Sequence, residues 1–241
     1  MDTIKVAHGK TRMVAHRGVS KLERENTYAA FVAAGNRSYW GVETDVRTTA
    51  DGHFIILHDE TTARVSGELV SVKPEESTLE TLRAISLTEL DGVTVNPALR
   101  LPTLGEYIRV CKKYEKHCVL ELKTEMDEAT TARMIDVIRA EDYLEHVTFI
   151  SFLFEDLVHV RKLLPRQKIQ FLFGELSDEL FDRMKTYRMN VDIRYKHLTP
   201  ELVKKFHDAG MEVNCWTVDD PQDAARLIEW GVDQITSNIL E

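Results

Sequence analysis

The fold is decided by residues 39–59, which read YWGVETDVRTTADGHFIILHD. Within this stretch, residues 39–46 are predicted to form one strand, and residues 54–57 are an apolar run with the length of another. Residues 49–52 between them form a tight turn signal. A tight turn joins antiparallel strands, whereas parallel neighbours need a crossover of a dozen or more residues. The second run is therefore predicted to be the return arm of a hairpin that extends the first strand.

Outside this hairpin, strands and helices alternate, which is typical of a parallel sheet. The other predicted strands are 12–16, 119–123, 147–152, 168–173, 191–194, 212–218 and 233–236. The predicted helices between them are 28–34, 104–114, 127–141, 155–164, 178–188, 200–209 and 221–230. Without the return arm the count is eight strands, which predicts an α/β fold of the (β/α)₈ TIM-barrel type. The runner-up, an open doubly wound sheet, requires a glycine-rich loop after the first strand, where Gly18 stands alone.

Residues 60–101 break the alternation. They are polar, contain turn-forming glycines and prolines, and include one weakly amphipathic helix predicted over 79–90. The segment is too short for a core of its own. We therefore expect a single TIM-barrel domain over residues 1–241, with a small insertion after the second strand.

Composition limits the partners and the compartment. The formal net charge is −9, and no basic block occurs, which argues against nucleic acid and anionic membrane surfaces. No apolar run approaches the roughly 18 residues of a membrane span, so stable membrane insertion is not expected. Three scattered cysteines, Cys111, Cys118 and Cys215, predict no disulfide framework and favour a reducing compartment. We expect a cytoplasmic protein.

Three carboxylates occur near the ends of neighbouring barrel strands. Glu43 and Asp45 are two residues apart on one strand, so their side chains share a face, and Glu121 and Lys123 repeat this spacing on the next barrel strand. Adjacent carboxylates repel each other unless a cation lies between them. An all-oxygen set suits Mg²⁺ or Ca²⁺ better than zinc. The alternative for each pair is a buried salt bridge or a solvated strand edge.

Two histidines and several further side chains follow the same strand ends. His16 and His58 each follow an apolar run and precede a polar residue, which suggests a general acid–base pair, although a lone histidine is more often a core or surface residue. The Arg17 guanidinium matches a phosphate bidentately.

Lys123 beside the carboxylates indicates an anionic ligand, and metal, arginine and lysine together form a clamp for phosphoryl transfer. Trp216 and Phe152 are candidates for an apolar wall against the rest of a substrate, with a core role as the alternative.

In order and spacing, the motifs that hold these residues resemble the glycerophosphodiester phosphodiesterase family. The matching motifs are HRG at 16–18, ENT at 25–27, ETD at 43–45, HD at 58–59, ELK at 121–123, ISF at 150–152, NCWTV at 214–218 and GVD at 231–233. The resemblance covers residues 12–238. It implies a TIM barrel of the phospholipase C-like type, with a segment inserted after the second histidine.

The resemblance also implies a reaction, the metal-dependent hydrolysis of small glycerophosphodiesters to glycerol 3-phosphate and an alcohol. The implied roles are acid–base catalysis by His16 and His58, binding of one divalent metal (Mg²⁺ or Ca²⁺, with Mn²⁺ a further candidate) by Glu43, Asp45 and Glu121, and phosphate binding by Arg17 and Lys123. Two departures are visible: Ser237-Asn238, where the family often has Thr-Asp, and the segment after His58-Asp59, which is only loosely similar. We expect neither departure to touch the catalytic set.

Two alternatives stay open. One is a lysophospholipase D-type lipid phosphodiesterase, which would need an exposed apolar lip that the polar insertion does not suggest. The other is a barrel that binds anions without turnover. The alcohol group, the native metal, the division of acid and base roles between the histidines and the oligomeric state are not determined by the sequence.

Overall fold

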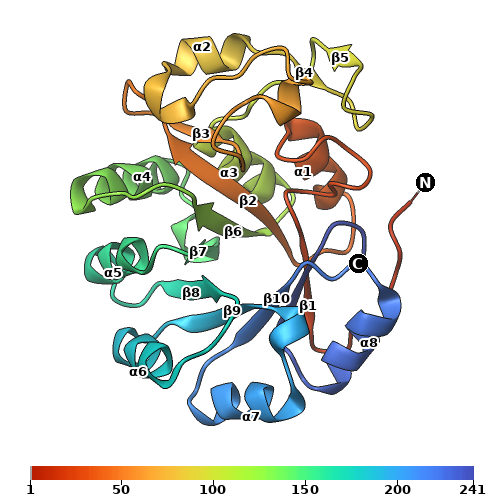
Figure 1. Cartoon of the computed structure of the whole chain (residues 1–241), viewed down its shortest axis with the longest axis vertical. Helices are drawn as coiled ribbons and strands as arrows, with labels where there is room; N and C mark the ends of the chain where they lie inside the picture. Colours follow the sequence, from red (N-terminus) through yellow and green to blue (C-terminus); the bar gives the residue numbers. More distant parts are fainter. Residues whose placement is uncertain (1) are drawn as a thin grey trace.

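The computed structural model describes residues 2–241, and its centre is a closed ring of eight parallel strands (Figure 1). The ring strands are β1 (Arg12–Ala15), β2 (Gly41–Thr48), β6 (His117–Leu122), β7 (Val147–Ser151), β8 (Lys168–Phe173), β9 (Asn190–Arg194), β10 (Val213–Trp216) and β11 (Gln234–Ser237). Each strand pairs in parallel with the next, and β1 closes the ring by pairing with both β11 and β2. The predicted TIM barrel is therefore confirmed.

The extra strand lies outside this ring. β3 (Phe54–Ile56) is antiparallel to the end of β2, with Val46 opposite Ile56 and Thr48 opposite Phe54. The turn between them needs Gly52, whose φ of +80° lies in the left-handed region. The hairpin expected from residues 39–59 is confirmed, and it brings the chain after β3 back alongside β2.

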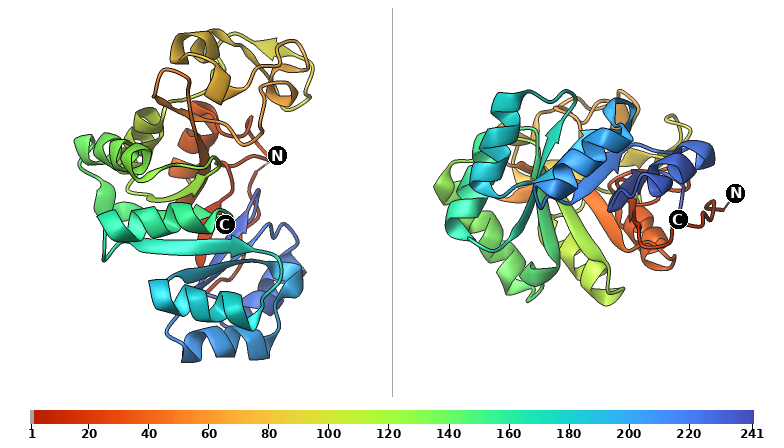
Figure 2. Two further views of the ribbon diagram at one scale, coloured as in Figure 1. Left: turned by 60° about the vertical axis from the view of Figure 1, so that its left-hand side comes forward. Right: turned by 90° about the horizontal axis from the view of Figure 1, so that it is seen from below.

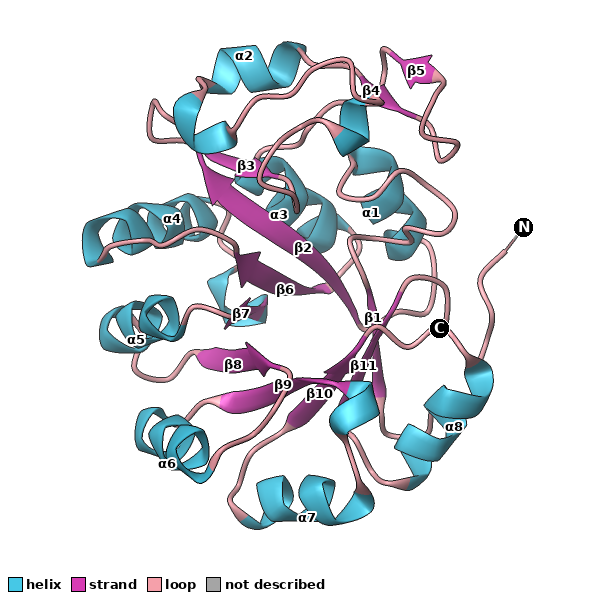
Figure 3. Cartoon of the chain, viewed as in Figure 1, coloured by secondary structure: helices cyan, strands magenta, loops and turns pink. Residues whose placement is uncertain are grey.

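The outer helices begin at the caps that the sequence offers. The main helices are α1 (Tyr28–Gly35), α3 (Leu104–Lys113), α4 (Glu128–Ala140), α5 (Phe154–Leu163), α6 (Asp178–Tyr187), α7 (Pro200–Asp208) and α8 (Pro221–Glu229). All of them except α5 have an N-cap side chain that accepts a backbone N–H, such as Thr27 at α1 and Asp127 at α4. They surround the ring on its outer side (Figure 3).

Residues 60–101 form a small cap at one end of the long axis, beyond the β2–β3 hairpin and α1 (Figure 2). The cap consists of short elements: η1 (Arg64–Ser66), η2 (Pro74–Glu76), α2 (Leu79–Ala84), β4 (Leu87–Thr88) and β5 (Val95–Asn96). Its buried side chains, including Leu82 and Leu87, pack against Ile55 and Leu57 from the hairpin. The cap thus takes part of its apolar core from the hairpin.

The prediction of a helix to residue 90 is wrong, because α2 ends at Ala84. Ile85 is already extended, and the chain continues into β4, which pairs with β5. The guanidinium of Arg24, from the loop before α1, donates to the carbonyl of Thr88 at 2.6 Å. These tertiary contacts outweigh a weak helical preference.

The floor below the carboxyl ends of the strands is apolar. Val14, Val119, Ile150 and Leu172 form a small buried cluster, against which Trp216 packs. Within the described part of the chain, no helix combines the length and the apolar character needed to cross a membrane.

Candidate active site

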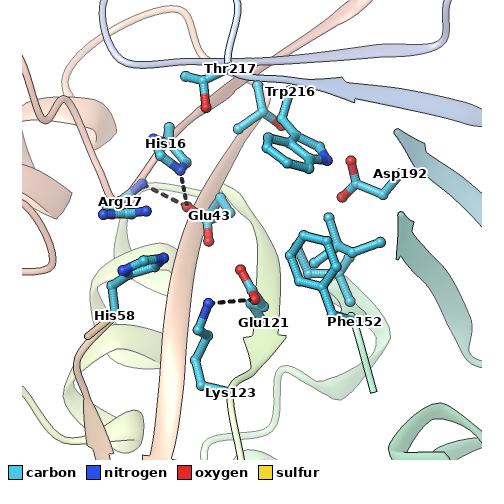
Figure 4. A pocket seen from close by; sticks show the side chains of 13 residues that line it. His16, Arg17, Glu43, His58, Glu121, Lys123, Phe152, Asp192, Trp216 and Thr217 are labelled. Carbon is cyan, nitrogen blue, oxygen red and sulfur yellow. Dashed lines mark hydrogen bonds and ion pairs between the residues drawn. The ribbon is translucent and has the colours of Figure 1, made fainter. Parts of the chain in front are cut away.

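The structure brings the predicted site residues together at the carboxyl end of the barrel (Figure 4). They lie on β2, β6 and β10, just after β1, β6 and β7, and two residues after β3. One pocket is lined by His16, Arg17, Glu43, His58, Glu121, Lys123, Phe152 and Trp216. Asp45, the remaining predicted residue, forms one cluster with Glu43 and Glu121. The three carboxylates lie within their strands, and the other site residues lie at or just after strand ends, so all of them meet at the carboxyl end of the barrel.

Glu43, Asp45 and Glu121 form a buried acidic cluster. One oxygen from each carboxylate lies within 4.8 Å of the others. Burial and the neighbouring Asp45 raise the pKa of Glu43 well above its ordinary value. Burial and Asp45 also raise the pKa of Glu121 to about 7. Burial alone would raise the pKa of Asp45, but Arg17, His58 and Lys123 outweigh it and lower the pKa.

This cluster fits a divalent cation. The Lys123 ammonium donates to Glu121 Oε1 at 2.8 Å and lies 3.8 Å from Asp45 Oδ1. Asp45 Oδ1 is nevertheless buried without a hydrogen-bond partner among residues 2–241. Burial and the neighbouring carboxylates raise the pKa values of Glu43 and Glu121 even with Arg17 and Lys123 beside them. A buried, all-oxygen set with a free oxygen suits a hard cation such as Mg²⁺ or Ca²⁺.

Arg17 joins the loop after β1 to this cluster. Its φ of 55° lies in the left-handed region, and its backbone N–H donates to Glu43 Oε2 at 2.8 Å. Its guanidinium donates to Glu25 Oε1 at 2.9 Å and lies 3.5 Å from Asp45 Oδ2. Left-handed backbone is costly for a residue with a side chain, and it clusters at functional sites. Gly18 follows because a Cβ there would lie 2.6 Å from the backbone of Ala30.

Asn26, from the loop before α1, contacts the acidic cluster. The cap of α1 is Thr27, whereas Asn26 is left-handed with a φ of 55°. Its Nδ2 donates to Asp45 Oδ2 at 2.7 Å, and its Oδ1 accepts from the Thr44 hydroxyl at 2.7 Å. Asn26 therefore holds Asp45 in place within the cluster.

His58 is held by a chain of charged groups. Its Nδ1 lies 2.8 Å from Asp59 Oδ1, and Arg64 from the insertion donates to Asp59 Oδ2 at 2.7 Å. Arg64 also donates to both oxygens of Glu25 at 2.8 Å. Burial lowers the pKa of His58, and Asp45 opposes that shift. No pattern in the sequence pointed to Arg64, because it lies in the polar insertion.

His16 is held by an amide instead. Its Nδ1 lies 2.7 Å from Asn238 Oδ1, and Asn238 Nδ2 donates to Asp219 Oδ2 at 2.7 Å. The expectation that the departure at Ser237-Asn238 leaves the catalytic set untouched is therefore wrong. Burial and the Arg17 charge lower the pKa of His16 to about 4. His16 Nε2 lies 3.9 Å from Glu43 Oε2, at the edge of the acidic cluster.

The opposite wall of the pocket is aromatic. Phe152 and Trp216 meet edge to face, with ring centroids 5.8 Å apart. Phe152 is exposed, whereas Trp216 is packed against the barrel floor. Asp192 on β9 lines the same wall, and sequence analysis missed it. Its signal was one acidic residue between the apolar Val191 and Ile193 of a predicted strand.

A buried oxygen cluster next to an arginine and a lysine is suited to the cleavage of phosphate esters, since both cations and a metal can stabilise phosphoryl charge. Fold and site together place the chain among TIM-barrel enzymes of phosphoryl transfer. A family model described as the glycerophosphoryl diester phosphodiesterase family matches residues 16–240. The chain therefore belongs to this family of phosphoric diester hydrolases, and the resemblance noted in the sequence is confirmed.

Curated relatives carry the same name. The chain is 32% identical over 237 residues to a glycerophosphodiester phosphodiesterase of Caldanaerobacter subterraneus, covering 95% of this chain and 94% of the relative. It is 27% identical to a glycerophosphodiester phosphodiesterase of Bacillus subtilis, covering 93% and 82%.

Solved structures share the fold. A glycerophosphodiester phosphodiesterase of Parabacteroides distasonis is 26% identical, with a TM-score of 0.79 and coverage of 95% of this chain and 93% of that chain. A phosphodiesterase of Oleispira antarctica, in complex with the product sn-glycerol 3-phosphate, is 24% identical, with a TM-score of 0.85 and coverage of 98% and 96%.

Proposed function

We propose that this protein hydrolyses glycerophosphodiesters to glycerol 3-phosphate and an alcohol, with one divalent metal and with His16 and His58 as the acid–base pair. The observation that carries the proposal is the acidic cluster between two histidines with different partners, an amide for His16 and a carboxylate for His58. The names of the relatives support the substrate class, as does the sn-glycerol 3-phosphate bound to the Oleispira enzyme.

Glu43, Asp45 and Glu121 would hold the metal, with Mg²⁺ or Ca²⁺ favoured and Mn²⁺ a further candidate. When bound, the metal supplies Lewis-acid stabilisation of the negative charge on the phosphoryl oxygens. Arg17 and Lys123, on the same side of the pocket, bind the phosphate through their own charges.

His16 is the group best suited to accept a proton. Asn238 Nδ2 donates to Asp219, which fixes Oδ1 of the amide as the atom that faces His16. That oxygen can only accept, so the neutral imidazole carries its proton on Nδ1 and leaves Nε2 with a free lone pair. His16 Nε2 would then take the proton from the attacking group, either the glycerol hydroxyl next to the phosphate or a water.

His58 is the group better suited to donate one. Its Nδ1–H donates to the Asp59 carboxylate, and Asp45 and Asp59 both oppose the lowering of the His58 pKa that burial causes. His58 Nε2–H would then protonate the oxygen of the leaving alcohol. Arg64 keeps Asp59 ionised, because its hydrogen bonds lower the pKa of that carboxyl. The two histidines thus divide the proton transfers between them.

The remaining expectations belong to this proposal. Residues 1–241 form one TIM-barrel domain, and 60–101 is its insertion, supported by the core that the insertion shares with Ile55 and Leu57. Phe152 and Trp216 form the wall against the part of the substrate beyond the phosphate. The partner is a small molecule, with neither nucleic acid nor membrane insertion involved. A cytoplasmic location is supported by three buried free cysteines.

The test is release of glycerol 3-phosphate from glycerophosphocholine by purified protein supplied with Mg²⁺, Mn²⁺ or Ca²⁺. We expect release with at least one of these metals, and a loss of roughly 10³-fold in His16→Ala. His146→Ala, which changes an exposed histidine outside the pocket, is the matched control. No release with any of the three metals, or full activity of His16→Ala, would contradict the proposal.

A second candidate, a lysophospholipase D-type activity, is favoured by one observation. The insertion exposes apolar side chains, with Leu69 70% and Val93 79% exposed, and Gly67 and Gly92 beside them are in contact. The expectation that the insertion offers no apolar lip is therefore wrong. Leu69 and Val93, with Gly67 and Gly92, form what we call the tip of the insertion. Arg64, just before Gly67 in the chain, contacts Asp59 and Glu25 at the site.

Kinetics on lysophosphatidylcholine and glycerophosphocholine separate the two candidates. If the acyl chain lies on this tip, Leu69→Ser with Val93→Ser will raise KM for the lysolipid several-fold and leave KM for glycerophosphocholine unchanged. Equal effects on both substrates would remove the lipid candidate.

A further inference from the structure

Asp192 is a buried acid that the proposed mechanism does not use. It is 1% exposed and lines the pocket from β9, beside Trp216 and Phe152 and on the side away from His16 and Arg17 (Figure 4). Neither Oδ1 nor Oδ2 has a hydrogen-bond partner within residues 2–241. Burial raises the pKa of Asp192 well above its ordinary value; the nearby Asn214 amide opposes that shift, and Glu121 adds to it. An unpaired buried carboxyl is costly, so the position calls for a ligand.

A second unpaired polar atom lies on the neighbouring strand. The indole Nε1 of Trp216 is buried and has no acceptor in the described chain. β10 and β9 pair in register, with Asn214 opposite Asp192 and Trp216 opposite Arg194, so Asp192 and Trp216 point to the same face of the sheet. Figure 4 shows the Asp192 carboxyl and the nitrogen-bearing edge of the indole on the same side of the pocket.

The two atoms differ in hydrogen-bond character. The indole N–H can only donate, whereas a carboxyl accepts and, when protonated, also donates. A hydroxyl group satisfies both, because it accepts from one and donates to the other. A quaternary ammonium group has no lone pair to accept from the indole N–H and no N–H to donate to the carboxyl, so it would leave the indole unpaired. Apolar Ile150 and Leu172 line the pocket near the indole and the carboxyl, so water competes less for their hydrogen bonds.

The position of this pair indicates which hydroxyl it binds. Arg17 and Lys123 lie on the other side of the pocket, where the phosphate is proposed to bind (Figure 4). The glycerol hydroxyl next to the phosphate belongs near His16. The terminal hydroxyl is the one farthest from the phosphate along the glycerol chain.

We propose that Asp192 and the Trp216 indole N–H bind the terminal glycerol hydroxyl and thereby select glycerophosphodiesters over diesters of other alcohols. This inference rests on the proposed function. It adds a specificity pair on β9 and β10 to the catalytic group on β1, β2 and β6.

The experiment compares two substrates with the same leaving group. One is glycerophosphocholine, and the other is its analogue built on propane-1,2-diol, which keeps the hydroxyl next to the phosphate and lacks the terminal one. Choline release gives kcat/KM for both. We expect the wild type to prefer glycerophosphocholine by roughly 10²-fold, because a site built to bind a hydroxyl discriminates strongly against an analogue without it.

Variants of Asp192 and Trp216 then test whether these two residues cause the preference for glycerophosphocholine. Asp192→Leu should lose roughly 30-fold in kcat/KM on glycerophosphocholine and less than about threefold on the analogue. Asp192→Asn, which keeps both donor and acceptor, should recover most of the preference. Trp216→Phe keeps the ring and should lose about tenfold on glycerophosphocholine alone.

The outcomes separate this inference from the proposed function. If the wild type releases choline from neither substrate, the proposed function itself fails. If the wild type uses both substrates equally well, or if Asp192→Leu and Trp216→Phe lose activity equally on both, the specificity pair is overturned while the function stands. If Asp192→Leu does not fold, as judged by circular dichroism, Trp216→Phe decides: loss confined to glycerophosphocholine supports the pair, and equal loss refutes it.

Discussion

The two sides of the barrel end differ in how they satisfy their polar groups. The side built from β1, β2 and β6 carries paired charges, with Arg17 and Lys123 against the acidic cluster. The side built from β7 to β11 carries neutral polar side chains and aromatic rings, such as Asn214 bound to Thr236 and Phe152 against Trp216. Asp192 is the exception on this second side, a carboxyl without a cation beside it.

The difference follows from what each side has to do. Charge that develops on a phosphate is stabilised by preorganised opposite charges in a dry site. An uncharged alcohol is selected by shape and by hydrogen bonds that become unpaired when the wrong group enters. The charged side therefore governs turnover, and the neutral side governs the choice of substrate.

Glu43→Gln tests the charged side and should have the largest effect. It removes one charge from the proposed metal site, so we expect kcat/KM on glycerophosphocholine to fall by roughly 10³-fold or more. Glu179→Gln, at an exposed position on α6, is the control. Wild-type activity in Glu43→Gln would show that the cluster does not take part in turnover.

Although Glu43→Gln should lower activity, it should raise the stability of the metal-free protein. Burial raises the pKa of Glu43, so folding loses free energy as the pH rises through that raised value. Metal-free Glu43→Gln should therefore unfold at a higher temperature than the metal-free wild type at pH 8.

Metal removal is the next test. Treatment with EDTA should abolish choline release, and Mg²⁺, Ca²⁺ or Mn²⁺ should restore it. Metal at 100 times its Kd should raise the free energy of unfolding by about 2.7 kcal/mol, because it binds only the folded cluster. Thermal unfolding of Glu43→Gln should respond far less to the metal. An unchanged unfolding temperature of the wild type with any of these metals would contradict a site at the cluster.

Asn238→Leu tests the orientation of His16 and should have an intermediate effect. It removes the acceptor at 2.7 Å from Nδ1, so we expect kcat to fall roughly 30-fold with little change in KM. Ser20→Ala removes another hydrogen bond to the same Asn238 oxygen and should cost less than about threefold. The ¹⁵N shifts of His16 should show loss of the Nδ1–H tautomer in Asn238→Leu, and an unchanged tautomer would refute the role of Asn238.

Asp156→Asn should have the smallest effect on activity. The variant tests whether a buried carboxyl with a raised pKa can lie outside the active site. Asp156 lies on α5 outside the pocket, and burial raises its pKa to about 6. Its ionisation destabilises the fold as the pH rises through about 6, so the variant should gain unfolding temperature relative to the wild type at pH 8 but not at pH 4. Activity should stay at the wild-type level. An equal change in unfolding temperature at pH 4 and pH 8 would show that ionisation of Asp156 is not what destabilises the fold.

Sequence by itself determined the features that depend on local geometry. The turn at Asp51-Gly52 made residues 54–57 antiparallel to β2, which gave the ring its eight strands. The two-residue spacing of Glu43 and Asp45 put both carboxylates on one face, because side chains alternate along any strand. Such periodicities act within a few residues and can be seen without knowing what lies opposite.

Only the tertiary structure decided which partners these residues have. Asn238 reaches His16 because β11 closes the ring beside β1, across a separation of 222 residues. Arg64 reaches Asp59 and Glu25 because the insertion folds back over the site. Asp192 is left without a partner by the packing of the strands around it. Hydrogen-bond partners across a barrel depend on how the ring closes, and no local pattern in the chain encodes that closure.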